Sequence, residues 1–400
     1  MRGALSWPYL QLYLLTLFYF SANSILNVVI PLRGESLGAS NATVGMIMGS
    51  YLLTTMLLRP WAGQVIHKHG PIKVLRAILA VNGLALILYA FTGLEGYLAA
   101  RMLQGACTAF FSMALQLGII DALPEKDRSQ GISMYSLCSY LPGILGPLLA
   151  VGIWQAGEMD YFAITMIAIA VVTGIVGYGA KMVPRETVPP EPGQPGQAGA
   201  MLRSFGQYVK NPHLFRCSLL MLTASVVFGS ATTFIPLYAD EIDGGSAAVY
   251  LMGQAGIVVA SRFALRKHIP SDGKWHAGYM MGIMAMLAAA AASVGHASAG
   301  GAAFFYAGAV LMGLAQALLY PTLTTYLTFV LPAAGRNVLL GLFIATADLG
   351  VSLGGILMGP LADLCSYSAM FMICAVLGAL MVGAAYGSRR QERVTARHGE

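Results

Sequence analysis

The chain has 400 residues, of which 57% are hydrophobic and only 10% are charged, and its formal net charge is +6. An ordinary soluble domain carries roughly 25% charged residues. This composition therefore excludes a water-soluble globule, because a chain of this length could not hide so much apolar surface from water. Most of that surface must face lipid or other helices.

Twelve apolar runs follow one another along the chain. Each has about the 20 residues that a helix needs to cross a hydrocarbon core of roughly 30 Å, and none shows the alternating pattern of barrel strands. The predicted spans are 8–30, 42–66, 73–93, 97–121, 130–154, 161–182, 213–238, 246–266, 275–296, 302–328, 337–361 and 366–387. The sequence therefore predicts an all-α integral membrane protein with twelve transmembrane helices.

Lysine and arginine are distributed unequally between the two sets of loops. With the N-terminus inside, most of them fall on the cytoplasmic side, and the opposite loops are mainly acidic. The acidic residues predicted outside are Glu35, Glu95, Glu158, Asp160, Asp240, Glu241 and Asp243. The positive-inside rule thus predicts an even number of spans with both termini cytoplasmic. The first run has no cleavage site behind it and is expected to remain as a helix.

Several short patterns recur about 200 residues apart. The repeated pairs are Arg59…Gly70 with Arg262…Gly273, Pro124…Arg128 with Pro332…Arg336, and Gly146-Pro147 with Gly359-Pro360. We predict an N-terminal six-helix bundle (1–182), a flexible Pro- and Gly-rich cytoplasmic linker (183–211), a C-terminal six-helix bundle (212–388) and a basic cytoplasmic tail (389–400). Two equivalent membrane bundles are typical of a secondary transporter with a central site.

Asp348 is the sharpest candidate for proton coupling. It follows Arg336 by twelve residues, which places it roughly 18 Å along a helix. A charge at that depth is costly and is by default a functional hypothesis. The alternative is a structural acid that is hydrogen-bonded to Thr346 or Ser352, or paired across the bundle.

Polar residues also form stripes at helical spacing. One stripe contains Arg101 and Gln104 and ends at Gln116, and others contain Asn23 with Asn27 and Gln316 with Tyr320. Such stripes must face protein or water, and they favour a central substrate-binding cavity over simple helix-joining contacts. Arg101 could bind an anionic group of the substrate or pair with a carboxylate that closes the outer gate.

The sequence contains no P-loop, no dinucleotide fingerprint and no nucleophile constellation. The five cysteines, expected within helices, have no metal-ligand spacing. We therefore expect neither an enzyme, nor a cofactor, nor a metal site. Uphill transport would have to use an ion gradient.

Three motifs resemble those of the major facilitator superfamily, specifically its twelve-helix drug:proton antiporters. They are Gly63-x-x-x-His67-x-x-Gly70-x-x-Lys73, Arg101-x-x-Gln104-Gly105 and Pro142-Gly143-x-x-Gly146-Pro147. The resemblance implies the major facilitator fold, antiport, and a link of Arg101 to proton coupling beside Asp348. Candidate gating residues are Gly63, His67, Gly70, Arg128, Gly146, Pro147 and Arg336. His67 stands where the family has an aspartate, so this chain lacks the carboxylate that contacts helix eleven in that family.

Segments 21–27, 269–273 and 335–350 are similar to staphylopine-type metallophore exporters. This resemblance implies a protein of the bacterial cytoplasmic membrane that exports opine metallophores, which are small chelators with several carboxylates and amines. We expect it to act as a monomer. Its partners would be the metallophore, protons and the lipid bilayer, with no nucleic acid. The alternatives are a broad multidrug:proton antiporter, an importer of the same fold, and a membrane sensor that does not transport.

Overall fold

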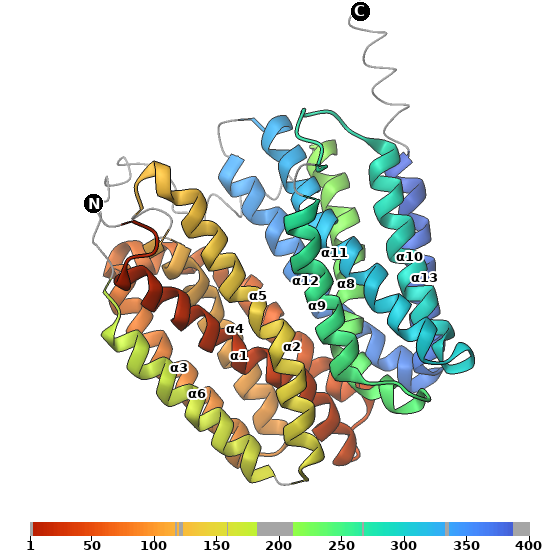
Figure 1. The fold of residues 1–400 in the computed structure, drawn as a ribbon, viewed down its shortest axis with the longest axis horizontal. Coiled ribbons are helices and arrows are strands. Elements are labelled where there is room, and N and C mark those ends of the chain that lie inside the picture. Colours follow the sequence, from red (N-terminus) through yellow and green to blue (C-terminus); the bar gives the residue numbers. More distant parts are fainter. Residues whose placement is uncertain are drawn as a thin grey trace, which may run out of the picture. The chain divides into compact units, whose positions relative to one another are not determined.

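The computed structural model describes residues 3–116, 118–119, 123–157, 159–181, 211–265, 268–332 and 336–386. Apart from Asn211, the predicted linker lies outside the described residues, as does the predicted tail. The helices are α1 (Trp7–Ser36), α2 (Asn41–His69), α3 (Pro71–Phe91), α4 (Leu94–Gln116), α5 (Glu125–Gln155), α6 (Met159–Gly179), α8 (Pro212–Tyr238), η2 (Ala239–Glu241), α9 (Ala247–Ala264), α10 (Ala277–Gly300), α11 (Ala302–Val330), α12 (Arg336–Leu364) and α13 (Tyr367–Tyr386) (Figure 1).

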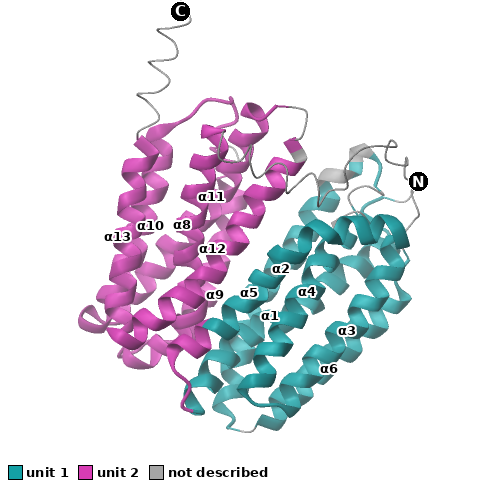
Figure 2. Cartoon of the chain, turned by 180° about the vertical axis from the view of Figure 1, so that it is seen from behind, with its two compact units in different colours: residues 1–37, 46–200 teal, residues 38–45, 201–400 magenta. Residues whose placement is uncertain are grey.

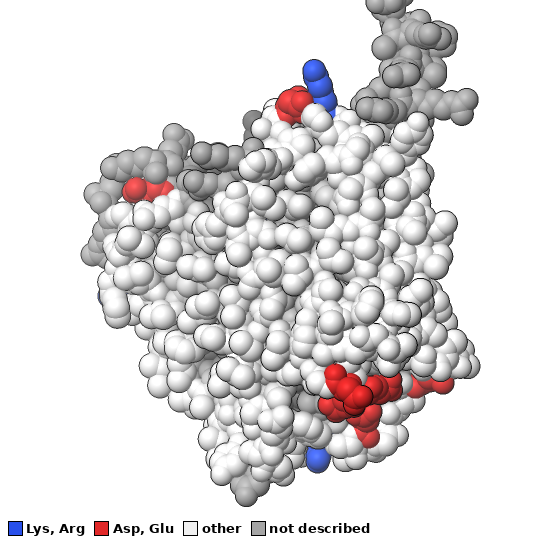
Figure 3. All heavy atoms as spheres, turned by 45° about the vertical axis from the view of Figure 1, so that its right-hand side comes forward, with Lys and Arg blue, Asp and Glu red and all other residues white. Residues whose placement is uncertain are grey.

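The described residues contain 12 helices that are long and apolar enough to span a membrane. The prediction of twelve transmembrane helices is confirmed. Several helices are longer than the predicted apolar spans. For example, α1 continues to Ser36 and α12 to Leu364, because the backbone hydrogen bonds of a helix do not stop where the apolar run ends. The face drawn in Figure 3 is a broad uncharged belt with charged side chains only toward its ends.

The chain forms two compact units, shown in different colours in Figure 2. Unit 1 comprises residues 1–37 and 46–200, and unit 2 comprises residues 38–45 and 201–400. The first residues of α2 thus cluster with unit 2, while the rest of that helix belongs to unit 1.

Unit 1 is built around α1, which packs on α5 and α6, while α3 packs on α4 and α6. Ser24 on α1 donates a hydrogen bond of 2.8 Å to the carbonyl of Pro142 on α5. One turn further along α5, Gly146 lies so close to Ser24 that a Cβ atom would not fit. Small residues therefore set the spacing of this pair of helices.

Unit 2 repeats this arrangement with α8 and α12. Ser230 on α8 donates to the carbonyl of Val226 on its own helix at 2.8 Å and shares this hydrogen with the carbonyl of Gly354 on α12 at 3.3 Å. A Cβ on Gly354 would collide with the carbonyl of Val226. The remaining helices pack as α10 against α13 and α11, and α11 against α9.

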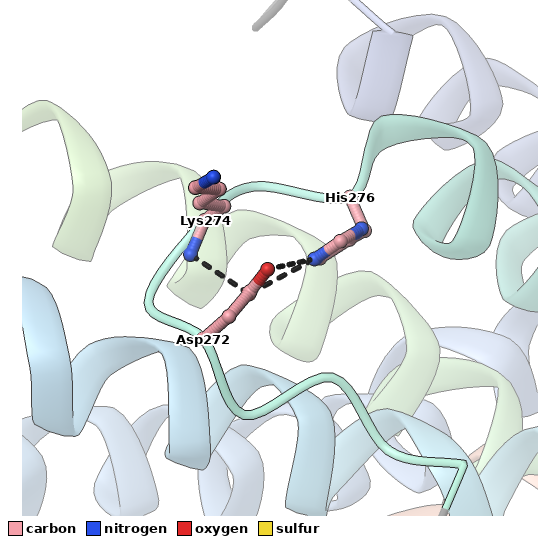
Figure 4. A network of polar contacts seen from close by, with 3 residues as sticks. All are labelled: Asp272, Lys274 and His276. Atoms are coloured by element: carbon pink, nitrogen blue, oxygen red, sulfur yellow. Dashed lines mark hydrogen bonds and ion pairs between the residues drawn. The ribbon is translucent and has the colours of Figure 1, made fainter.

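The two repeated loop glycines both have a positive φ. Gly70 has φ 83° and Gly273 has φ 72°, a left-handed conformation that favours glycine. Near Gly273, Asp272 accepts hydrogen bonds from the backbone of Lys274 at 3.1 Å and from the ring of His276 at 2.9 Å (Figure 4). These bonds hold the pKa of Asp272 below its usual value.

The N-terminus of α2 is held by α12 rather than by its own loop alone. The carboxylate of Asp363 accepts from the backbone N–H groups of Asn41 at 2.8 Å and Ala42 at 2.9 Å. Tyr367 donates to the side chain of Asn41 at 2.6 Å. These contacts account for the clustering of residues 38–45 with unit 2.

One placement expected from the sequence is wrong. Cys365 is not in a helix but is exposed in the turn between α12 and α13, because α12 ends at Leu364. The described residues contain no group of three His, Cys, Asp or Glu side chains that could hold a metal ion.

Candidate transport site

Arg101 lies at the centre of the polar cluster in unit 1. Its side chain is 0% exposed, and α4 directs it toward α1. Nη1 donates to Oδ1 of Asn23 at 2.7 Å, and Nη2 donates to Oδ1 of Asn27 at 2.6 Å. Nη1 also donates to Gln104 on α4 at 3.3 Å. Four of the predicted site residues are therefore in direct contact.

Aromatic rings complete the cluster. The guanidinium carbon of Arg101 lies 5.1 Å from the centre of the Tyr51 ring, a cation–π distance. The hydroxyl of Tyr51 bonds Thr108 at 2.9 Å, and Tyr19 bonds the same threonine oxygen at 2.9 Å. Tyr89 donates to Gln104 at 3.2 Å. The side chain of Arg101 is thus held by residues of α1, α2 and α4.

The close packing of α2 against α4 positions the Tyr51 ring. Thr55 donates to the carbonyls of both Tyr51 and Gly105, at 2.9 and 2.8 Å. A Cβ on Gly105 would fall on the carbonyl oxygen of Tyr51. The glycine of the Arg101-x-x-Gln104-Gly105 motif therefore lets α2 approach closely enough for the ring to reach the arginine.

The charge of Arg101 has no carboxylate partner among the described residues, and its acceptors are neutral amide oxygens and a methionine sulfur. The proposed pairing with a gate carboxylate is therefore not observed. Burying an ion costs several kcal/mol even after relaxation. The neutral oxygens and the aromatic ring offset part of this cost and leave the cluster with a net positive charge.

The polar cluster of unit 2 is neutral at its centre. Gln254 on α9 donates to Oε1 of Gln316 on α11 at 3.0 Å. Tyr320, one turn beyond Gln316, stacks on Phe343 of α12 with ring centres 6.2 Å apart. Gln316 and Tyr320 thus face neighbouring helices of their own unit, and Gln254 is a partner that the sequence did not reveal.

Asp348 is half-buried in the middle of α12. Ser352 donates to its backbone carbonyl at 3.0 Å and not to its carboxylate, and Thr346 donates to the carbonyl of Leu342 at 3.0 Å.

The candidate gating residues lie at several places in the fold. His67 is in the last turn of α2, because that helix continues past residue 66, the predicted end of the span, to His69. Arg336 begins α12 and donates to the carbonyl of Leu331 at 3.1 Å. Gly63 is half-buried within α2, and Pro147 lies inside α5 next to Gly146. The side chains of Gln116 and Arg128 are outside the described residues.

Sequence reasoning missed Tyr51, Tyr89 and Gln254. Each lies within an apolar run, where an aromatic ring or a single amide is usually part of the core. The available signal was weak. Tyr51 comes four residues before Thr55, which places two polar groups on one face of α2.

Residues 12–303 match the family model described as Major Facilitator Superfamily. This chain belongs to the major facilitator superfamily. It is a multi-pass protein of the cytoplasmic membrane and a transporter, not an enzyme.

Its relatives and the solved structures that it resembles agree with this assignment. The chain is 54% identical to a protein named Staphylopine export protein from Staphylococcus aureus, over 94% of this chain and 95% of that protein. It is 26% identical to an uncharacterized MFS-type transporter from Pseudomonas aeruginosa, over 89% of this chain and 87% of the other.

Among solved structures, the nucleoside transporter NupG, in a variant form, matches with a TM-score of 0.75 at 14% identity, over 94% of this chain and 98% of that one. A bacterial homolog of the lysosomal transporter Spinster, inward-facing and unoccupied, gives 0.73 at 14% identity, over 95% and 96%. At these identities the structures show the shared fold alone.

Proposed function

We propose that this protein exports a small opine-type metallophore by alternating access, driven by protons that move inward. The observation that carries the proposal is the 54% identity, over 94% of the chain, to a protein named for the export of staphylopine. The cluster around Arg101 supports it, because a buried positive charge among amides suits a cargo that carries carboxylates.

The proposal includes an orientation and an energy source. Both termini are placed in the cytoplasm, because most lysines and arginines then fall on that side. Asp348 is proposed to take up and release the coupled proton, with Arg101 linked to the same step, and no cofactor is required. The protein is proposed to act as a monomer.

The proton gradient is large enough for this work. Moving one charge through 100 mV provides about 2.3 kcal/mol. At roughly 150 mV, one proton would provide about 3.5 kcal/mol, enough for a cargo gradient of a few hundredfold at about 1.4 kcal/mol per decade.

The test is to measure staphylopine inside and outside cells that produce the chelator together with the intact chain, the Asp348→Asn variant or neither. Each culture is assayed with and without a protonophore. We expect the intact chain to move the chelator outward, and both the substitution and the protonophore to stop it. Unchanged chelator distribution would refute the substrate, and export that survives the protonophore would refute proton coupling.

The same cells distinguish the multidrug alternative. Ethidium, an aromatic cation, should be exported no faster with the protein than without it. Rapid ethidium efflux that is indifferent to the loss of Arg101 would favour a broad multidrug antiporter instead.

A further inference from the structure

The arginine cluster fixes the direction of two amide groups on α1. A guanidinium carries donors and no acceptor. Asn23 and Asn27 must therefore turn their oxygens toward Arg101, as they do at 2.7 and 2.6 Å. In each side chain the amide nitrogen, with its two N–H donors, lies on the side away from the guanidinium.

These donors are accessible, whereas the arginine is not. Arg101 is 0% exposed, while Asn23 and Asn27 are half-buried. Neither amide nitrogen donates to another described residue, and neither is among the buried polar atoms that lack a partner. Because the two residues are four apart on one helix, their side chains are neighbours, with Cβ atoms about 5–6 Å apart.

We propose that Arg101 is a positioning residue, and that the amide N–H groups of Asn23 and Asn27 are the atoms that bind a carboxylate of the cargo. This inference rests on the proposed function and deepens it. The buried cation orients both amides and polarises them, which strengthens their N–H groups as donors. The surface that results offers donors to carboxylates and repels ammonium groups.

Aspartate at either position separates this role from a structural one. In Asn23→Asp or Asn27→Asp, one oxygen still accepts from Arg101, so the arginine keeps its partner. The other oxygen replaces the N–H donors with negative charge. Two variants are useful because each tests the inference if the other does not fold, which thermal unfolding of the purified protein will show.

The assay compares staphylopine with its methyl-esterified form, in liposomes that contain the full chain under an imposed pH gradient. The intact chain should prefer the free acid at least about tenfold in apparent KM, since hydrogen bonds to a charged group are worth 1.5–3 kcal/mol. In either aspartate variant the KM for the free acid should rise about tenfold or more, and the preference should disappear. The maximal rate for the ester should persist.

The matched control is Gln155→Glu, the same amide-to-acid change at an exposed residue at the end of α5 in unit 1. It should leave the preference unchanged. A folded aspartate variant that still prefers the free acid overturns the inference, as does an intact chain that moves acid and ester equally well. If the intact chain moves neither compound, the proposed function itself fails.

Discussion

The junction of α1 with α5 in unit 1 and the junction of α8 with α12 in unit 2 are built alike. In the first, Ser24 donates to the carbonyl of Pro142, and in the second, Ser230 donates to the carbonyl of Gly354. Each junction also has a glycine where a Cβ atom would meet the partner helix. The two junctions therefore share a mode of packing, although the glycine in unit 2 is Gly354, whereas the repeated Gly359 meets the start of α2.

The buried polar groups of the two units differ. Unit 1 encloses the cation of Arg101 among amide oxygens, whereas unit 2 has a neutral pair, Gln254 and Gln316, and an acid, Asp348, on a different helix. Helix packing in both units depends on small residues, which occur in each. Recognition of the cargo depends on polar residues, which differ between the two units, so this difference marks the candidate site.

The largest expected effect follows from removing the charge of unit 1. Arg101→Met should lower the initial rate of chelator export at least about 100-fold, because Asn23 and Asn27 lose the group that orients them. Its melting temperature should fall only a little, since removing a buried charge that no carboxylate compensates offsets the loss of the hydrogen bonds to the amide oxygens.

The matched variant in unit 2 is Gln316→Met, for which we expect a loss of about tenfold or less. Both rates are measured in the same proteoliposome assay at equal protein density. Equal losses from the two substitutions would show that the units contribute alike, and the asymmetry would then carry no meaning for the cargo.

The next effect concerns the shared packing. Gly105→Ala would push a Cβ atom against the carbonyl of Tyr51, and Gly354→Ala would push one against the carbonyl of Val226. A backbone carbonyl cannot move aside, so each variant should be destabilised by about 1–3 kcal/mol. Thermal unfolding in detergent measures the change.

Two other glycines serve as controls for this experiment. A Cβ atom on Gly152 in α5 or Gly253 in α9 would meet nothing within 4 Å. Alanine at these positions should leave the melting temperature unchanged or raise it slightly. If the tight and open positions respond alike, close helix approach is not what the small residues provide.

A third prediction contrasts the starts of α2 and α9. The first is capped by Asp363 from α12, and the second by its own Ser246, which accepts from the N–H of Val249 at 3.4 Å. Asp363→Ala should raise the hydrogen-exchange rate of residues 41–45 by about five- to tenfold, in keeping with caps worth about 0.5–2 kcal/mol. Exchange in α9 should not change.

The carboxylate of Asp243 provides the control for Asp363. It is exposed in the turn before α9, and Asp243→Ala should leave exchange at residues 41–45 as it is in the intact chain. Faster exchange there in both variants would indicate a general effect of lost charge rather than a lost cap.

The smallest effect is expected from the serines of the two junctions. Ser24→Ala and Ser230→Ala should each cost about 0.6 kcal/mol, the average for a hydrogen bond between membrane helices. The two changes in unfolding free energy should agree within error. A clear difference between them would mean that the junctions are alike in geometry but not in strength.

The sequence predicted the helices better than their contacts. Length and hydropathy define a membrane helix locally, so all twelve spans were found, and helical spacing correctly grouped Arg101 with Gln104. The contacts of Arg101 with Asn23 and Asn27 cross 74–78 positions of the chain, and they depend on how α1 packs beside α4.

Other residues gave no usable sequence signal. In the sequence, Tyr51 cannot be distinguished from an ordinary core aromatic residue. Its role depends on the close approach of α2 to α4 that Gly105 permits. In the sequence, Asp363 is one more charged residue at the end of an apolar run, and only the fold brings it to the start of α2. Spacing identifies residues on one helix face, but partners on distant helices require the packed structure.

The most direct test uses the purified intact chain in liposomes with an acidic interior, with staphylopine added outside. We expect the chelator to accumulate inside against its gradient while protons leave, and we expect Arg101→Met and Asp348→Asn to stop both movements. Chelator that only equilibrates, with no accompanying proton movement, would contradict proton-driven export.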